Sequence, residues 1–245
     1  MQKILGKMRK AIQDYNMIQE NDKIAIGLSG GKDSMALLYC LARLQKFSDI
    51  KFDIVAITIH PGMTEFDTSY LEKTCEELGV KYVIYKSDIK EIVFDIRNEK
   101  NPCSLCANLR RGMLTSVAIE NGCNKIALGH HYDDVIETFF LSLLYEGHIH
   151  TFSPVTYLSR NNIYTIRPFI YVEEKNIIKW VKKDNIQIMN KCCKIDGHTK
   201  REYMKDLVKK LVLDIPHVRA NIFGAIKRSN IRGWNIEGGT NEKKD

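Results

Sequence analysis

The residues best suited to bind a ligand are concentrated in one six-residue turn, Ser29-Gly30-Gly31-Lys32-Asp33-Ser34. An Ile-rich apolar run precedes this turn, and an amphipathic run of good helix formers follows it, which predicts a strand, a glycine turn and a helix. Such a turn aims backbone N–H groups at the positive end of a helix dipole, and its glycines leave no side chain between backbone and ligand. Because two hydroxyls and an ammonium group stand beside these donors, the turn suits a polyphosphate.

The spacing of this turn excludes two common phosphate loops. A Walker A loop needs four residues between its first Gly and the Gly-Lys pair, and a dinucleotide-binding turn needs Gly-x-Gly-x-x-Gly. Neither pattern is present. The remaining structural alternative, a plain glycine turn, is disfavoured by a match of six residues in a strand–helix context.

A second motif is the pair Cys103-x-x-Cys106, which follows Pro102 and opens a predicted helix. A helix start favours the thiolate form of cysteine. The pair alone suits a redox couple, half of a zinc site or part of a cluster. The chain has no second such pair, but it has Cys192-Cys193 downstream.

Three thiolates from two segments suit a [4Fe–4S] cluster with one iron left open, because such clusters usually take four cysteines. A structural zinc completed by His198 or another His is the alternative. The other cysteines, Cys40, Cys75 and Cys123, are expected to fill the core.

A third group of polar residues is the run Gly129-His130-His131-Tyr132-Asp133-Asp134. Asp134 and Glu137 are spaced to share one helix face. Carboxylates at a helix start, beside a bound triphosphate, are natural ligands of Mg²⁺. An Asp-rich helix cap is the plain alternative.

Alternating strand and helix patterns must position these groups. Strands are expected at residues 24–28, 52–59, 80–85, 124–129 and 164–169, and helices at 34–44, 64–78, 89–96, 105–121, 132–145 and 173–184. This alternation predicts an α/β fold, a parallel sheet with helices on both faces. Ligands of such sheets bind at the carboxyl ends of the strands. The glycine turn, His60 and Gly129 all fall at those ends and should meet in one crevice.

Composition and charge bound the class of protein. The 245 residues are 44% hydrophobic and 27% charged, which is typical of a globular chain. Most of the net charge of +7 falls beyond residue 190, which fits a polyanion such as RNA, although a solvated helix face is the plain alternative. No apolar stretch approaches the ~20 residues of a membrane span, and no signal peptide is recognised, so we expect no membrane partner and a cytoplasmic location.

These motifs come in the same order as in a known family. Together with Arg167-Pro168 and a late cysteine before Thr199-Lys200-Arg201, they resemble the tRNA thiolases of the TtcA/TtuA family, within the PP-loop ATP pyrophosphatase superfamily, the adenine nucleotide alpha hydrolase-like proteins. The similarity covers most of residues 1–232. It is greatest to the TtcA branch, which makes 2-thiocytidine in the tRNA anticodon loop, and Leu109-Arg110-Arg111-Gly112 strengthens it. The cysteine pairs for the zinc fingers of TtuA-type enzymes are absent from the sequence.

The resemblance implies ATP, Mg²⁺ and a [4Fe–4S] cluster as cofactors, and tRNA as the partner. The C2 oxygen of a tRNA pyrimidine would attack the α-phosphate of ATP, and sulfide would then displace AMP. Sulfide itself or a donor such as a cysteine desulfurase would supply the sulfur, and a homodimer is left open. The implied nucleotide-binding residues are Ser29, Gly30, Gly31, Lys32, Asp33, Ser34, His60, Gly129 and Asp134.

Within that set, Lys32, Asp33 and Asp134 are the implied catalytic residues, with Mg²⁺ near Asp133 or Asp134. The implied cluster ligands are Cys103, Cys106 and Cys193, with Cys192 as the alternative to Cys193. Arg110 and Arg111 are candidates for contact with tRNA phosphate, and a helix-surface role is the alternative.

The resemblance also suggests an organisation of the chain. An N-terminal helix would occupy residues 1–20, the PP-loop domain with the cysteine pair 21–190, a basic helical region with the third cysteine 191–236, and a disordered tail 237–245. Two other functions remain open at this point: another PP-loop ligase or amidotransferase that acts on tRNA, and a zinc-stabilised RNA-binding or sulfur-carrier protein. Iron content would separate these from a thiolase.

Overall fold

The computed structural model describes residues 1–62, 67–96, 102–189 and 200–235. The strands are β1 (Asp22–Gly27), β2 (Phe52–His60), β3 (Lys81–Lys86), β4 (Lys125–Ala127), β5 (Val155–Leu158) and β6 (Ile163–Ile166). The α-helices are α1 (Gln2–Asp14), α2 (Lys32–Phe47), α3 (Ser69–Leu78), α4 (Pro102–Glu120), α5 (Tyr132–Leu141), α6 (Glu174–Lys183), α7 (Lys200–Asp214) and α8 (Val218–Arg228). Two π-helical turns are η1 (Glu91–Ile96) and η2 (Ser142–Glu146).

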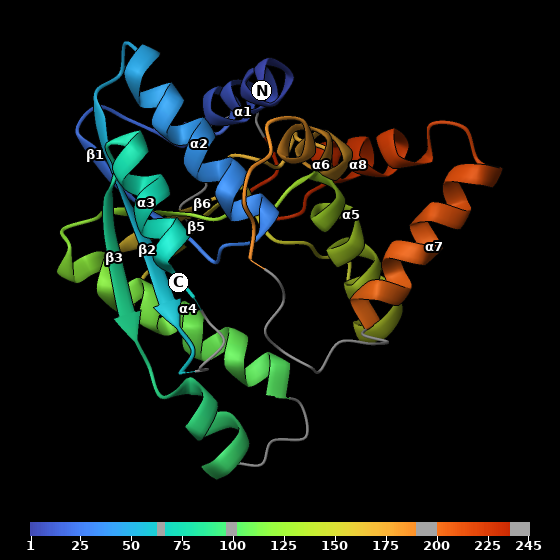
Figure 1. Ribbon diagram of the computed structural model, residues 1–245. Helices are drawn as coiled ribbons and strands as arrows, with labels where there is room; N and C mark the ends of the chain where they lie inside the picture. Colours follow the sequence, from blue (N-terminus) through green and yellow to red (C-terminus); the bar gives the residue numbers. More distant parts are fainter. Residues whose placement is uncertain (63–66, 97–101, 190–199, 236–245) are drawn as a thin grey trace.

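The strands form one sheet in the order β3-β2-β1-β4-β6-β5 (Figure 1). Every neighbouring pair from β3 to β6 is parallel, which confirms the predicted α/β fold. Strand β5 was not predicted. It pairs with β6 in an antiparallel hairpin, through a turn in which Asn162 has a φ of 50°.

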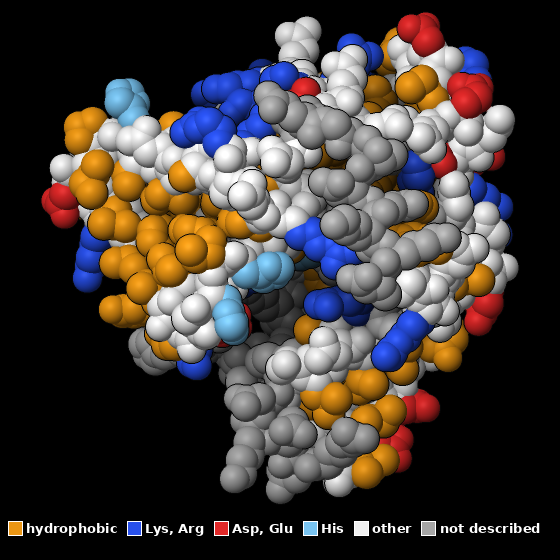
Figure 2. Space-filling model, turned by 180° about the vertical axis from the view of Figure 1, so that it is seen from behind, with side chains coloured by type: hydrophobic (Ala, Val, Ile, Leu, Met, Phe, Trp, Pro, Cys, Tyr) orange, Lys and Arg blue, Asp and Glu red, His pale blue; other side chains and the backbone are white. Residues whose placement is uncertain are grey.

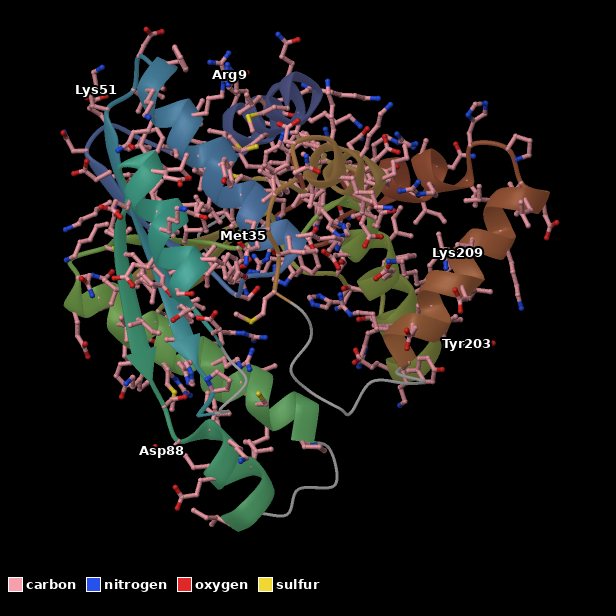
Figure 3. The ribbon with its side chains drawn as sticks, in the orientation of Figure 1. Arg9, Met35, Lys51, Asp88, Tyr203 and Lys209 are labelled. Carbon is pink, nitrogen blue, oxygen red and sulfur yellow. The ribbon has the colours of Figure 1, made fainter. Side chains whose placement is uncertain are left out.

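Alternating strand residues feed two cores, one on each face of the sheet. Ile24 and Ile26 of β1 point into the core that includes α1, α2 and α6. Ala25 points into the other core, which α4 and η1 cover. Figure 3 shows side chains crowded around Met35 of α2, whereas Tyr203 and Lys209 of α7 point outward. Helices α7 and α8 pack against α5, beside the sheet (Figure 1).

The predicted bounds of several helices shift in the structure. The helix expected at 64–78 is described from Ser69 and ends, as expected, with Gly79 in the left-handed conformation. Helix α4 begins at Pro102, earlier than predicted, because the fixed φ of proline suits the first helical position. The helix expected at 132–145 ends at Leu141 and continues as η2. The predicted tail at 237–245 lies outside the described residues.

A buried ion pair fastens the sheet below β4. Lys125 Nζ lies 2.7 Å from an Asp22 carboxylate oxygen and donates to the carbonyl of Met17 at 3.1 Å. Asn124 donates to the other carboxylate oxygen at 2.7 Å. Both charged side chains are less than a tenth exposed, so neither charge is compensated by water if its partner is lost.

We therefore expect Lys125→Met to lower the free energy of unfolding by about 3 to 5 kcal/mol, because it leaves the Asp22 carboxylate buried and unpaired. Urea denaturation measures this change. The matched control is Lys23→Met in β1, which removes a lysine that forms no ion pair among the described residues. Equal stability of the two variants would contradict the role assigned to the pair.

Candidate functional site

The glycine turn is braced by its own hydroxyl groups. Ser34 Oγ accepts a hydrogen bond from the N–H of Ser29 at 3.2 Å and donates to the carbonyl of Gly31 at 3.0 Å. Ser29 Oγ accepts from the N–H of Gly31 at 3.4 Å. Gly31 is the N-cap of α2, so the first N–H groups of that helix have no helical acceptor and remain for a ligand.

Gly30 holds the one position in the turn that no other residue suits. Its φ is 77°, and an added Cβ would lie 2.5 Å from the Tyr70 hydroxyl and 2.9 Å from Met189 Cβ. The carbonyl of Gly30 accepts hydrogen bonds from Tyr70 at 3.2 Å and from the N–H of Met189 at 2.8 Å. The turn is therefore clamped by side chains from two distant segments.

A cavity of about 420 Å³ opens at the carboxyl ends of the central strands. Ser29, Asp33 and Ser34 line one wall, and Arg110 and Arg111 of α4 line another. Apolar side chains from the strand ends and α4 form the floor: Leu28, Ile57, Ile59, Leu114 and Leu128. Gly27, Ala107, Gly129, His130 and Asp134 complete the lining, so two of the three predicted segments meet here.

Of the predicted site residues that the structure describes, Gly30, Gly31, Lys32, Cys106 and His60 do not line this cavity. His60 lies in the third predicted segment. It ends β2, and its Nδ1 accepts a hydrogen bond from the N–H of Gly62 at 3.1 Å. Gly129, in contrast, lies directly against the glycine turn. A Cβ on Gly129 would stand 3.0 Å from the carbonyl carbon of Asp33, so only a glycine lets the two segments approach this closely.

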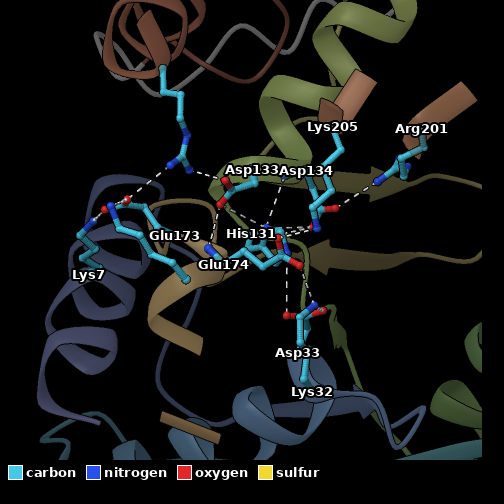
Figure 4. Close-up of polar contacts among 12 residues, drawn as sticks. Lys7, Lys32, Asp33, His131, Asp133, Asp134, Glu173, Glu174, Arg201 and Lys205 are labelled. Carbon is cyan, nitrogen blue, oxygen red and sulfur yellow. Dashed lines mark hydrogen bonds and ion pairs between the residues drawn. The ribbon is translucent and has the colours of Figure 1, made fainter. Parts of the chain in front are cut away.

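Lys32 points from the first turn of α2 toward two carboxylates (Figure 4). Its Nζ lies 2.7 Å from Asp33 and 3.0 Å from Glu174 of α6. Burial lowers the pKa of Lys32, but these two carboxylates outweigh burial and hold the pKa above its ordinary value. The other oxygen of Glu174 contacts Lys205 of α7 at 2.7 Å.

The pKa of Glu174 falls to about 2, because Lys205 and Lys32 outweigh its burial. Sequence reasoning missed Glu174, since no local pattern ties it to the turn 140 residues earlier. One oxygen of Asp33 remains buried with no hydrogen-bond partner among the described residues. His131 Nε2 lies 3.8 Å from this oxygen.

The two adjacent aspartates of α5 have different surroundings. Asp134 lines the cavity, accepts from the N–H of His131 at 2.9 Å and pairs with Arg201 at 3.0 Å. Asp133 turns away, accepting from Arg219 of α8 and from the N–H of Glu174 at 2.7 Å. Asp133 thus fastens α6 and α8 to α5, and Asp134 is the carboxylate left to face a ligand.

His130 and His131 also differ. His131 is the buried N-cap of α5, with Nδ1 accepting from the N–H of Asp134 at 3.4 Å. His130 lines the cavity and packs on the ring of Phe152, with ring centroids 5.0 Å apart. Burial lowers the pKa of His130 to about 4, so its ring is neutral at pH 7.

The cysteines fall into two groups. Cys40, Cys75 and Cys123 are buried in the core as expected, and burial raises the pKa of each thiol. Cys106 is half-buried and free in the second turn of α4, one helical turn before Arg110. The side chain of Cys103 and the whole of Cys192 and Cys193 lie outside the described residues. Among the residues that are described, no group of three or more His, Cys, Asp or Glu could hold a metal ion.

Glu137 lies on the face of α5 that meets α7. Its side chain is 6% exposed, and burial, followed by repulsion from Asp134, raises its pKa from 4.5 to about 7. The folded protein therefore holds a proton on Glu137 that the unfolded chain has released, at every pH between these two values. Stability from this group is full below about pH 4.5 and is lost as the pH rises through about 7.

We expect Glu137→Gln to flatten this pH dependence and to raise the free energy of unfolding at about pH 8 by about 1 to 3 kcal/mol. Chemical denaturation at about pH 5 and about pH 8 measures both effects. Glu120→Gln, which removes an exposed carboxyl at the end of α4, is the matched control and should change neither. A wild-type pH slope in Glu137→Gln would contradict the burial of an ionisable carboxyl here.

Comparisons with known proteins identify the family of this chain. A family model described as the PP-loop domain matches residues 2–211. A tRNA-cytidine(32) 2-sulfurtransferase of Dichelobacter nodosus is 41% identical over 223 residues, covering 90% of this chain and 83% of the relative. That of Syntrophotalea carbinolica is 37% identical over 220 residues, covering 89% and 85%.

A solved structure has the same fold. The U34-tRNA thiolase NcsA from Methanococcus maripaludis, with its [4Fe-4S] cluster, matches with a TM-score of 0.72 and 24% identity, over 90% of this chain and 76% of that chain. On the family model and the sequence identities, the chain belongs to the PP-loop family and, within it, to the family of the tRNA-cytidine(32) 2-sulfurtransferases.

Proposed function

We propose that this chain is an ATP- and iron–sulfur-dependent tRNA sulfurtransferase that replaces the C2 oxygen of a cytidine in the anticodon loop with sulfur. The observation that carries the proposal is the shared cavity: the glycine turn forms one wall, and the helix that bears Cys103 and Cys106 forms another. Activation by ATP and delivery of sulfur must act on the same atom. A cavity between these two elements meets that requirement.

The glycine turn is proposed to bind the phosphates of ATP. The N–H groups at the start of α2 and the ammonium of Lys32 would neutralise the pyrophosphate as it leaves, where charge develops. Lys32 already stands in the site, held by Asp33 and Glu174. The cytidine C2 oxygen would attack the α-phosphate, and AMP would then leave as sulfide adds to C2. Asp134, on the cavity wall, is the proposed ligand of Mg²⁺.

Cys103, Cys106 and Cys193 are proposed to hold a [4Fe–4S] cluster, with Cys192 as the alternative third ligand. The donor set is compatible with this cluster, because Cys106 is a free, half-buried thiol near the start of a helix. When bound, such a cluster supplies an iron site that three cysteines leave open for sulfide.

The described residues that flank residues 190–199 contact the glycine turn and α5. Met189, which donates to Gly30, and Arg201, which pairs with Asp134, lie on either side of residues 190–199. Cys193 follows Met189 by four residues in the sequence and lies outside the described residues.

The proposed partners follow from the reaction. tRNA is the substrate, and its base enters more readily from a single-stranded loop than from a duplex. Sulfide or a cysteine desulfurase is the proposed sulfur source, and a homodimer is compatible with the proposal. No helix in the described parts of the chain is long and apolar enough to cross a bilayer. We place the reaction in the cytoplasm, where thiols stay reduced.

The first test removes the ammonium group from the turn. Lys32→Ala should lower the rate of tRNA-dependent pyrophosphate release about 100-fold or more, because the developing charge loses its cation. Lys205→Ala is the matched control, since Lys205 contacts the same Glu174 from outside the turn, and it should stay within about threefold of the wild type. Wild-type pyrophosphate release in Lys32→Ala would reject the nucleotide assignment.

The second test concerns the cluster. Anaerobically reconstituted protein should be brown, with about four iron and four sulfide per chain. Cys193→Ala and Cys106→Ala should lose the cluster and sulfur transfer but keep ATP binding, because the nucleotide turn is built elsewhere. Cys192→Ala, the neighbouring control, should be milder.

Loss of the cluster in Cys192→Ala with full activity in Cys193→Ala would exchange the two ligands. Full activity in both single variants and in the double variant would reject the three-cysteine site. A colourless protein with one bound zinc, active in air, would favour the zinc-stabilised alternative.

A further inference from the structure

The two walls of the cavity differ in charge compensation. On the side of the glycine turn, the cations are paired with carboxylates, as Figure 4 shows. Lys32 and Lys205 share Glu174, Arg201 pairs with Asp134, and Arg219 pairs with Asp133. This side is close to electrically neutral.

Arg110 and Arg111 of α4 line the other wall of the cavity, and Arg167, which directly follows β6, is close enough to Arg111 for the two charges to repel. No ion pair among the described residues involves Arg110, Arg111 or Arg167. The Nε atoms of Arg110 and Arg167 are buried and have no hydrogen-bond acceptor in the described structure. Buried donors without acceptors cost free energy until a ligand supplies one.

Arg167 is fixed in place rather than free to turn away. Its Nη1 donates to the carbonyl of Ser153 at 2.6 Å and to the hydroxyl of Thr156 at 3.0 Å. Its guanidinium lies over the ring of Phe152, 5.1 Å from the centroid, and that ring also packs on His130. Burial, with added repulsion from Arg111, lowers the pKa of Arg167 to about 10. The positive charge of Arg167 is therefore buried at a cost in free energy, which a nearby anion would reduce.

We propose that Arg110, Arg111 and Arg167 form a second phosphate site, which binds a phosphodiester of the RNA next to the nucleotide whose base enters the cavity. This inference rests on the proposed function. It assigns the phosphates of ATP to the glycine turn and a phosphodiester of the RNA to the three arginines. Guanidinium groups suit this ligand, because they present donors in a planar fork that matches two phosphate oxygens.

The location favours RNA over ATP as the source of the phosphate. Arg111 is exposed at the rim, where a macromolecule outside the cavity reaches it. Arg110 stands one helical turn after Cys106, on the wall formed by α4 rather than on the side of the glycine turn. The face seen in Figure 2 is hollowed near its centre, with Lys and Arg side chains on one side of the hollow and His side chains on the other.

The test uses the full-length holoprotein and an RNA stem–loop that contains the target cytidine. The dissociation constants for this RNA and for ATP are measured separately for wild type, Arg110→Gln and Arg111→Gln. The matched control is Arg160→Gln, which removes an exposed guanidinium from the turn before β6, at the end of that strand opposite to Arg167. Thermal unfolding verifies that each variant is folded, and Arg167 is left intact because it is packed.

We expect Arg110→Gln to weaken RNA binding about tenfold and to reduce the slope of log affinity against log salt by about one. Arg111→Gln should act in the same direction, and ATP affinity should stay unchanged in both. Arg160→Gln should match the wild type. A methylphosphonate placed at successive positions around the cytidine should weaken wild-type binding at one position and leave Arg110→Gln unaffected there.

Four results would overturn the inference. RNA binding by Arg110→Gln and Arg111→Gln equal to that of Arg160→Gln would show that these guanidiniums meet no phosphodiester. Loss of ATP affinity with unchanged RNA affinity would assign them to the nucleotide. A wild-type protein that neither binds nor thiolates the RNA would reject the proposed function itself. Thiolation that stays at the wild-type level in both variants would instead reject only the phosphate site.

Discussion

The site depends on one close contact, between the glycine turn after β1 and the turn after β4. Gly129 lies against the backbone of Asp33 so closely that a Cβ there would stand 3.0 Å from the Asp33 carbonyl carbon. This contact brings the N-terminal ends of α2 and α5 together at one edge of the sheet. Two helix dipoles then raise the potential at the same point, which favours an anionic ligand there. The carboxylates and cations of the site are positioned by these two turns and the helices that follow them.

An ion-pair chain connects this frame to the C-terminal helices. Lys32 of the turn, Glu174 of α6 and Lys205 of α7 are joined in series, and Asp133 ties α6 and α8 to α5. A phosphate that draws Lys32 toward itself competes with Glu174 for the same ammonium group. Under the proposed function, binding of ATP would therefore weaken a contact that holds α7, the helix that begins directly after the segment with Cys192 and Cys193.

Sequence reasoning reached those parts of the structure that are encoded locally. The turn from Ser29 to Ser34, the alternation of strands and helices and the left-handed Gly79 each follow from a few adjacent residues. Strand β5 was missed because it is short and gains its identity only from antiparallel pairing with β6. Glu174, Arg201 and Arg219 were missed because their partners are far away in the chain. Asp133 contacts α6 and α8, whereas Asp134 faces the cavity. No local sequence pattern distinguishes these two adjacent carboxylates.

The central claim is that one cavity activates a tRNA cytidine with ATP and delivers sulfur to it. Mass spectrometry of tRNA nucleosides tests this most directly, in cells that lack the protein and in the same cells after its gene is restored. The account predicts that 2-thiocytidine is absent without the protein, returns with the wild-type chain, and does not return with Lys32→Ala or Cys106→Ala. Unchanged 2-thiocytidine in the cells that lack the protein, with no other thionucleoside lost, would contradict it.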